Sequence, residues 1–265
     1  MNVWRLPRVF AFSAASFILS SHAFAGLISV DLGVAGRPLP FSGVEPQAAA
    51  IDGVFAEAAL WNELGLASDW KEPPTTDPSF ENLLDNTGNP TGISLSLRGN
   101  LNSFNYNINY SEPGTGPLFG DYWFFNSRYA SDEIEWILSG LMPNTTYRMV
   151  FYGPSNDQNR VFDMFVDTDG DGDLTDEQAV SVHSMAGAFP APTYVDTIIS
   201  SDSGKILGRG VGKERTTPDL QYEANWAGFQ LVAVPRTPTV PEPATLALLG
   251  LGLAGLGWSR RQHAF

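Results

Sequence analysis

The fold is constrained most by a series of short segments in which apolar residues alternate with polar or small ones. This period of two is typical of a β-strand with one buried face. Turn-forming residues separate the segments, which recur at intervals of roughly 10–20 residues, as in all-β proteins. We therefore expect an antiparallel β-sandwich, or jelly roll. The expected strands are 27–34, 93–97, 104–110, 134–138, 146–152, 162–166, 179–183, 194–199 and 229–234.

Three segments have other patterns. Residues 47–64 are rich in alanine, which predicts a short helix. Residues 208–213 are rich in glycine but lack the spacing of a phosphate-binding loop, which favours a mobile turn. Residues 139–143 (Ser-Gly-Leu-Met-Pro) predict a hairpin turn before the strand at 146–152. No period of 20–50 residues recurs, which argues against a solenoid or a propeller.

Charge and cysteine content exclude several classes of function. The formal net charge is -14, which repels nucleic acid, so we expect no nucleic-acid partner. The chain has no cysteine, which excludes thiol nucleophiles and thiolate metal sites. An exported domain without disulfides depends on its core or on bound metal for stability.

Residues 1–25 have the organisation of a secretory signal peptide. Arg5 and Arg8 supply the positive start, and residues 9–19 form an apolar stretch. Residues 23–25 (Ala-Phe-Ala) supply the small residues of a cleavage site before Gly26. We therefore expect the chain to be exported and the folded domain to begin at residue 26.

The C-terminal end has three elements in a fixed order. Pro241, Glu242 and Pro243 precede an apolar run at 244–258, and Arg260 and Arg261 follow it. The run predicts a membrane helix whose basic tail stays in the cytoplasm, because positive charge flanks the cytoplasmic end. Residues 234–239 contain two prolines and predict an extended linker between this tail and the domain.

This tail resembles the PEP-CTERM sorting signal of Gram-negative bacteria, which we assign to residues 240–265. The resemblance implies that exosortase, a membrane protease, recognises and processes the chain. The protein would be anchored in the inner membrane by its C-terminus before processing, and would then reach the cell surface or the extracellular space.

The domain itself, residues 26–233, resembles PEP-CTERM proteins that have a galactose-binding-like jelly roll. That resemblance implies an antiparallel two-sheet fold of a kind often used to bind carbohydrate, but it transfers no binding site. The residues that carry it are Val30-Asp31, Trp61-Asn62, residues 90–93 (Pro-Thr-Gly-Ile), Asp121-Tyr122, residues 139–143 and residues 227–231 (Ala-Gly-Phe-Gln-Leu).

An acidic segment matches the opening of a calcium-binding loop. Carboxylates recur at every second position, and Gly172 permits a sharp turn at the sixth position of the loop. Gln178 stands where the bidentate glutamate of such loops would be, and the expected strand at 162–166 replaces the usual preceding helix. The alternative is a solvated acidic hairpin without metal. The candidate ligands for Ca²⁺ are Asp167, Asp169, Asp171, Asp173 and Glu177.

Other residues offer weaker candidates for chemistry. His183 lies in an expected strand without an identified catalytic partner, and carboxylates near Glu135 form no distinct glycosidase pair. Asparagines within residues 100–109 could face sugar hydroxyls or solvent. Five aromatic side chains could stack on sugars, although core packing is the more common role of such residues. These aromatic residues are Trp61, Trp70, Tyr122, Trp123 and Trp226.

These observations favour a non-enzymatic surface or matrix protein that interacts with carbohydrate in an exopolysaccharide layer or biofilm. One alternative is a structural surface protein whose only ligand is calcium. Another is a hydrolase or lyase that acts on the polysaccharide.

Overall fold

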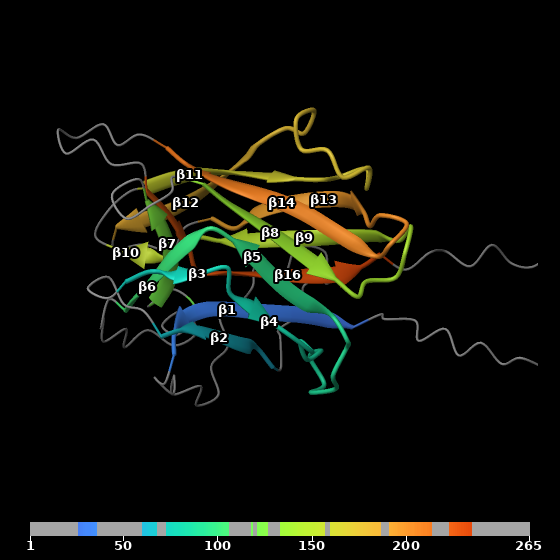
Figure 1. Ribbon diagram of the computed structural model, residues 1–265, viewed down its shortest axis with the longest axis horizontal. Coiled ribbons are helices and arrows are strands. Elements are labelled where there is room, and N and C mark those ends of the chain that lie inside the picture. Colours follow the sequence, from blue (N-terminus) through green and yellow to red (C-terminus); the bar gives the residue numbers. More distant parts are fainter. Residues whose placement is uncertain are drawn as a thin grey trace, which may run out of the picture.

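The structure, a computed structural model, describes residues 26–35, 60–67, 73–105, 118, 121–126, 133–156, 160–186, 191–213 and 223–234 (Figure 1). All its named elements are strands. They are β1 (Leu27–Val34), β2 (Asn62–Leu66), β3 (Thr75–Thr76), β4 (Ser79–Phe80), β5 (Ser94–Arg98), β6 (Asn100–Asn105), β7 (Asp121–Asn126), β8 (Glu133–Ser139), β9 (Thr146–Tyr152), β10 (Ser155–Asn156), β11 (Arg160–Val166), β12 (Val180–Ala186), β13 (Thr193–Ile199), β14 (Lys205–Gly212), β15 (Glu223–Trp226) and β16 (Gly228–Ala233).

The strands form three sheets. A five-stranded sheet has the order β13-β9-β16-β1-β2, and a seven-stranded sheet has the order β10-β12-β11-β14-β8-β5-β4. A four-stranded sheet has the order β15-β7-β6-β3. All pairings are antiparallel except β1 with β2 and β10 with β12. In Figure 1 β14, β8 and β5 form one layer, and β9, β16 and β1 form the other. The expected antiparallel β-sandwich is confirmed.

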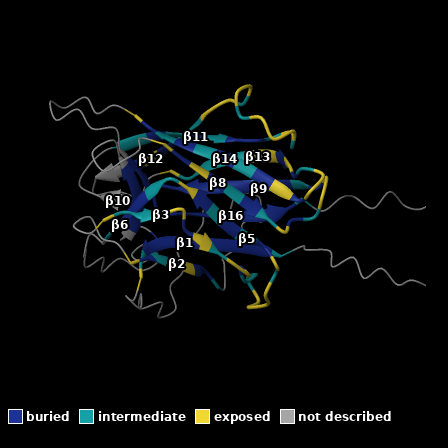
Figure 2. Ribbon diagram, in the orientation of Figure 1, coloured by how far each residue is buried: buried dark blue, intermediate teal, exposed yellow. Residues whose placement is uncertain are grey.

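The core between the two larger sheets is built on aromatic side chains. Trp136 of β8 lies 6.1 Å from Phe151 of β9 and 6.2 Å from Trp226 of β15, measured between ring centroids. Phe229 of β16 lies 5.7 Å from Trp226. All four side chains are buried, and Figure 2 shows buried positions along the inner strands with exposed ones in the loops. Burial of this much apolar surface is the main force that holds the sheets together.

The five-stranded sheet is also covered on its second face. A separate apolar cluster there includes Trp61, Leu118 and Tyr152. Buried polar groups cross the sheet in a chain, in which the Tyr152 hydroxyl donates to Gln230 Oε1 at 2.6 Å and Gln230 Nε2 donates to Ser29 Oγ at 2.8 Å. Each of these polar atoms therefore keeps a partner in the interior, where an unpaired group would be costly.

The glycine-rich segment at 208–213 is not a turn, and that expectation was wrong. Residues 205–212 form β14, which pairs with β11 on one side and β8 on the other. Its glycines Gly208, Gly210 and Gly212 occupy alternate positions that face the core. Gly208 lies directly opposite Trp136, whose indole ring occupies the space that a Cβ at Gly208 would need. Gly210 lies in the same way against Phe125, so Gly208 and Gly210 make room for large core side chains.

Two other expectations are corrected. The alanine-rich segment does not end in a helix, because its last residues, Asn62–Leu64, belong to β2 and pair in parallel with β1. Residues 47–59 lie outside the described residues. Residues 139–143 do not form a hairpin, because β8 and β9 belong to different sheets and the segment connects the two layers. Leu141 of this connection is buried between them.

The limits of the remaining strands also differ from expectation. β6 begins at Asn100, and residues 106–110 of the strand expected at 104–110 lie outside the described residues. The sequence analysis did not anticipate β7 and β15, which pair with each other. β7 shows no alternation because its four consecutive aromatic residues, 122–125, are buried on both faces. β15 has only four residues, which is too short for a period of two to stand out in the sequence.

Candidate functional site

The acidic loop connects β11 to β12 and begins with a buried aspartate. The Asp167 side chain is 0% exposed, and it accepts hydrogen bonds from the backbone N–H groups of Gly170 (2.7 Å) and Gly172 (3.0 Å). Both glycines have positive φ, 83° and 87°, which the tight turn around the carboxylate requires. The sequence Asp-Thr-Asp-Gly-Asp-Gly therefore folds around its first carboxylate.

The loop is held firmly against the sandwich. Asp167 N donates to the Leu207 carbonyl at 3.0 Å, and Ile199 N donates to the Thr168 carbonyl at 2.8 Å. A Cβ at Gly170 would lie 2.7 Å from the Ile199 carbonyl oxygen, so the loop touches the end of β13 closely. The positions of the acidic side chains are therefore set by the ends of β13 and β14.

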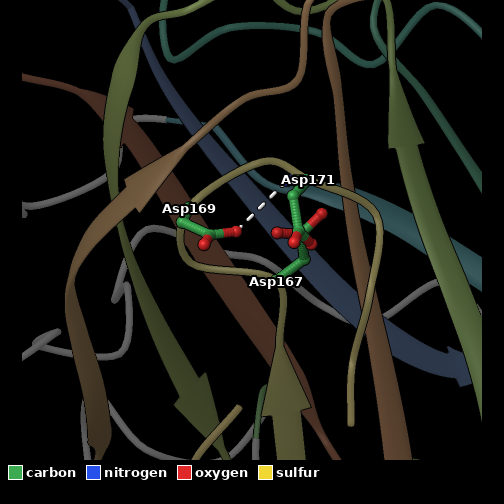
Figure 3. Close-up of side chains that lie close together, drawn as sticks. All are labelled: Asp167, Asp169 and Asp171. Carbon is green, nitrogen blue, oxygen red and sulfur yellow. Dashed lines mark hydrogen bonds between the residues drawn. The ribbon is translucent and has the colours of Figure 1, made fainter. Parts of the chain in front are cut away.

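Three carboxylates converge in this loop. Asp167, Asp169 and Asp171 each offer one oxygen, and these oxygens lie within 4.8 Å of one another. Figure 3 shows the three side chains turned toward a common point, with the Asp171 N–H donating to Asp169 Oδ1 at 3.2 Å. Asp169 and Asp171 are exposed, so one side of the cluster is open to solvent. Carboxylate oxygens grouped in this way are the ligands that Ca²⁺ and Mg²⁺ prefer.

The other two candidate ligands are held elsewhere in the loop. Asp173 Oδ1 accepts a hydrogen bond from Thr175 N at 2.8 Å. Glu177 Oε1 accepts from the Thr168 backbone N–H at 2.6 Å, and both of its oxygens lie within 3.0 Å of the Thr168 hydroxyl. The structure thus brings together three of the five expected ligands and gives the other two structural partners.

The electrostatics of the loop favour a cation. Burial raises the pKa of Asp167, the two N–H donors lower it, and the charges of Asp169 and Asp171 raise it again. Burial is the largest of these effects. Asp173 differs, because its hydrogen bond from Thr175 N lowers its pKa. A bound divalent cation would offset both the burial of the Asp167 charge and the repulsion between neighbours.

Four of the five candidate aromatic residues are core residues. Trp61 is 9% exposed, and Tyr122, Trp123 and Trp226 are exposed by 5% or less, so none presents its ring to solvent. Trp70 lies outside the described residues. The core-packing interpretation is thus confirmed for these four, and they offer no surface for stacking on a sugar.

Among the asparagines at 100–109, the side chains of Asn100 and Asn102 are described, and neither is exposed. Asn102 is 2% exposed, and the Asn100 amide oxygen accepts a hydrogen bond from the Thr76 hydroxyl at 2.7 Å. Residues 106–109 lie outside the described residues. His183 is exposed on β12, opposite Val161 of β11, and Glu135 lies 3.6 Å from Arg98.

The sequence analysis missed one group of outward-facing side chains, of which Lys205 and Lys213 are exposed and the others half-buried. The outward-facing residues of β14 and the residue after it are Lys205, Leu207, Arg209, Val211 and Lys213, which alternate with buried residues. This alternation is present in the sequence, but the glycines between these residues favoured the prediction of a turn. A period-two reading of residues 205–213 would have identified both the strand and its basic outer face.

The structure can be compared with known proteins. None of the curated proteins matches the chain. The ANXUR1 extracellular domain from Arabidopsis thaliana is 13% identical, with a TM-score of 0.32 over 51% of this chain and 38% of its own. The chain thus spans less than two fifths of that protein's length.

Two smaller solved structures are similar at the same level. The CBM36-1 domain of a xylanase from the hindgut metagenome of Trinervitermes trinervoides is 12% identical, with a TM-score of 0.29 over 51% of this chain and 87% of its own. TmCBM61, solved with β-1,4-galactotriose, is 14% identical, with a TM-score of 0.30 over 54% of this chain and 88% of its own. Likenesses this distant transfer neither a ligand nor a site.

The targeting segments expected at the two ends of the chain stand differently, because a comparison bears on the C-terminal one alone. The expected signal peptide and the apolar run at 244–258 lie outside the described residues. Within the part of the chain that the structure describes, no helix has the length and apolar character needed to cross a membrane. One family model matches the C-terminal end, the PEP-CTERM protein-sorting motif, over residues 239–261. The chain therefore carries a PEP-CTERM sorting signal, at the position where the sequence analysis expected one.

Proposed function

We propose that this chain is a cell-surface or extracellular-matrix protein of a Gram-negative bacterium that exosortase processes after export. Its β-sandwich would be a non-catalytic module that interacts with carbohydrate in an exopolysaccharide layer or biofilm. The observation that carries the proposal is the sorting motif at 239–261, directly after a folded β-sandwich. In this proposal residues 1–25 are the signal peptide, 26–233 the domain, 234–239 the linker and 240–265 the sorting signal, with its transmembrane helix.

Calcium in the acidic loop is part of this proposal. Its support is the group formed by Asp167, Asp169 and Asp171, in which one carboxylate is fully buried and two are exposed. An extracellular protein meets calcium at high concentration, so a site of modest affinity would be filled. The loop is fixed to β13 and β14, so the cation would stabilise the junction of both sheets.

The carbohydrate interaction is supported by the outer face of the seven-stranded sheet. Outward residues of β5 and β8 include the hydroxyls of Ser94, Ser96 and Ser139, next to the half-buried Ile137. Hydroxyls beside apolar groups match the two kinds of surface that a sugar ring offers. The competing candidate is a structural protein with calcium alone, which the burial of Trp61, Tyr122, Trp123 and Trp226 favours.

The first prediction concerns the sorting motif. Replacing Glu242 by alanine in the native host should leave the chain at full length and in the membrane fraction, because the protease no longer recognises its signal. The unaltered chain should lose its C-terminal segment. Mass spectrometry of surface and membrane fractions measures both. Glu81→Ala, the same change within the domain, is the control, and removal of the tail from Glu242→Ala would contradict the proposal.

The second prediction concerns carbohydrate. Processed protein from the cell surface should be retained on the host's own extracellular polysaccharide in millimolar calcium, and at least tenfold less in chelator, because calcium would stabilise the folded domain at the junction of its sheets. A pull-down quantified by immunoblot measures this. Equal lack of retention in both buffers would favour the structural candidate. Release of reducing ends from the polysaccharide would show an enzyme instead.

A further inference from the structure

The basic residues of the described domain gather on one surface, the outer face of the seven-stranded sheet. Four of the six lysines and arginines in the described residues lie there, although the whole chain has a net charge of -14. Acidic partners on the same face are Glu133, Glu135 and Asp163. In the described residues this face therefore has a small excess of basic residues, although the chain as a whole is strongly acidic. The four basic residues are Arg98, Lys205, Arg209 and Lys213.

Arg209 occupies the middle of this face and is held in a fixed position. Its guanidinium carbon lies 4.9 Å from the centroid of the Phe165 ring, on the neighbouring strand β11. Stacking on an aromatic ring leaves the edge of the guanidinium free to donate hydrogen bonds. A side chain already held in one orientation loses little entropy when it binds a ligand.

The hydrogen-bonding capacity of Arg209 is not used within the described residues. Its Nε atom is buried and has no hydrogen-bond partner, and its guanidinium lies over the Phe165 ring. Glu135 lies opposite Arg209 in the register, but the Glu135 carboxylate forms its ion pair with Arg98, at 3.6 Å. Lys213, by contrast, is paired with Asp163 at 2.7 Å. Arg209 is thus a fixed cation whose guanidinium has no hydrogen-bond or ion-pair partner among the described residues.

The surroundings of Arg209 match an extended ligand rather than a single small ion. Phe165, Arg209, Glu135 and Arg98 form a row across four strands, about 14 Å long at the usual strand spacing. Half-buried apolar side chains, among them Leu207 and Ile137 of neighbouring strands, border this row. The row places Arg209 beside the Arg98–Glu135 ion pair, with apolar surface along its length.

We propose that this face binds a carboxylated polysaccharide, with the Arg209 guanidinium donating to a uronate carboxylate and the apolar border contacting sugar rings. Planar guanidinium groups match carboxylates with two parallel hydrogen bonds, and the excess of basic residues on this face supplies complementary charge. The inference rests on the proposed carbohydrate interaction and narrows it to acidic glycans. It places the contact on β11, β14, β8 and β5, away from the buried aromatic residues.

The test uses the full chain in detergent, with hyaluronan fragments as the carboxylated probe and carboxyl-reduced hyaluronan as the neutral one. Arg209→Gln should weaken binding of hyaluronan at least tenfold and leave binding of the neutral probe unchanged. Arg209→Lys should lie between, since it keeps charge but loses the planar fork. Arg148→Gln, the same change on β9 of the five-stranded sheet, is the control and should bind like the parent chain. Thermal melts show that each variant is folded.

Each other outcome has a defined meaning. Unchanged hyaluronan binding by folded Arg209→Gln would overturn the inference and leave the proposed carbohydrate function intact. Binding of the neutral probe alone would do the same. If neither these glycans nor the host's polysaccharide bind the parent chain, the proposed function itself fails. Equal, Arg209-dependent binding to phosphatidylglycerol vesicles would show a general anion surface and overturn the assignment to polysaccharide.

Discussion

Replacing Gly208 by alanine destabilises the domain by about 3 kcal/mol or more, at the upper end of what overpacking a core usually costs. The added Cβ would lie 2.1 Å from Cε2 and Cζ2 of Trp136 and 2.6 Å from its Nε1. Trp136 is buried among Phe151 and Trp226, and its Nε1 donates to Met164 Sδ at 3.0 Å. The ring therefore has no free space to move into, and either the strand or the core must shift.

Thermal and urea unfolding measure this effect, with an expected fall in Tm of roughly 6–12 °C for a domain of this size. Val211→Ala on the same strand is the control, because its side chain points away from the core and its loss should cost only about 1 kcal/mol. Adding Trp136→Phe to Gly208→Ala should recover part of the loss, since the smaller ring vacates the contact. A Gly208→Ala variant as stable as Val211→Ala would contradict the packing argument.

Gly208 also shows why the sequence predicted some strands and not others. In residues 27–34, 93–97 and 146–152 apolar side chains themselves mark the buried face, so the period of two is visible. In β14 the buried face is marked by glycines, whose role depends on Trp136 of a strand about 70 residues earlier in the chain. A single-sequence pattern holds no information about such a distant partner, and local propensity therefore indicated a turn.

The candidate site shows a similar division. The position of the acidic loop between two strands followed from the alternating aspartates and the flanking strand patterns. The sequence could not show that Glu177 holds the Thr168 N–H, because that contact depends on how the loop closes. The burial of Trp61, Tyr122, Trp123 and Trp226 likewise depends on how the sheets pack against each other, which the sequence does not show. Arg209 was missed because the strand that carries it was not predicted.

The sandwich and the loop form one structure, which bears on what calcium would do. Asp167 follows β11 directly, and its backbone N–H binds the carbonyl of Leu207 in β14. The Thr168 carbonyl accepts a hydrogen bond from the backbone N–H of Ile199 at the end of β13. β13 belongs to the five-stranded sheet. A cation bound by Asp167, Asp169 and Asp171 would therefore be coupled to unfolding of both layers.

Asp167→Asn should abolish stabilisation by calcium and change the metal-free protein little. Calcium at a hundredfold above its Kd would stabilise the parent chain by about 2.7 kcal/mol. The expected rise in Tm is roughly 5–11 °C. Asparagine lacks the charge and one of the two acceptor oxygens, so the cation loses its buried ligand. Without metal, the lost acceptor for Gly172 N and the relief of a buried charge oppose each other. Differential scanning calorimetry in calcium and in chelator measures these differences.

The pH dependence of the same measurement tests the role of Asp167 further. Burial raises the pKa of Asp167, so without metal its ionisation opposes folding, and that cost disappears as the pH falls through the raised pKa. Calcium requires the ionised carboxylate, so its stabilising effect should disappear over the same range, above the pH at which an ordinary aspartate protonates. Asp176→Asn, an exposed carboxylate of the same loop, is the control and should keep the calcium shift. A full calcium shift in Asp167→Asn, or none in the parent chain at any neutral pH, would show that the loop is an acidic turn without a resident cation.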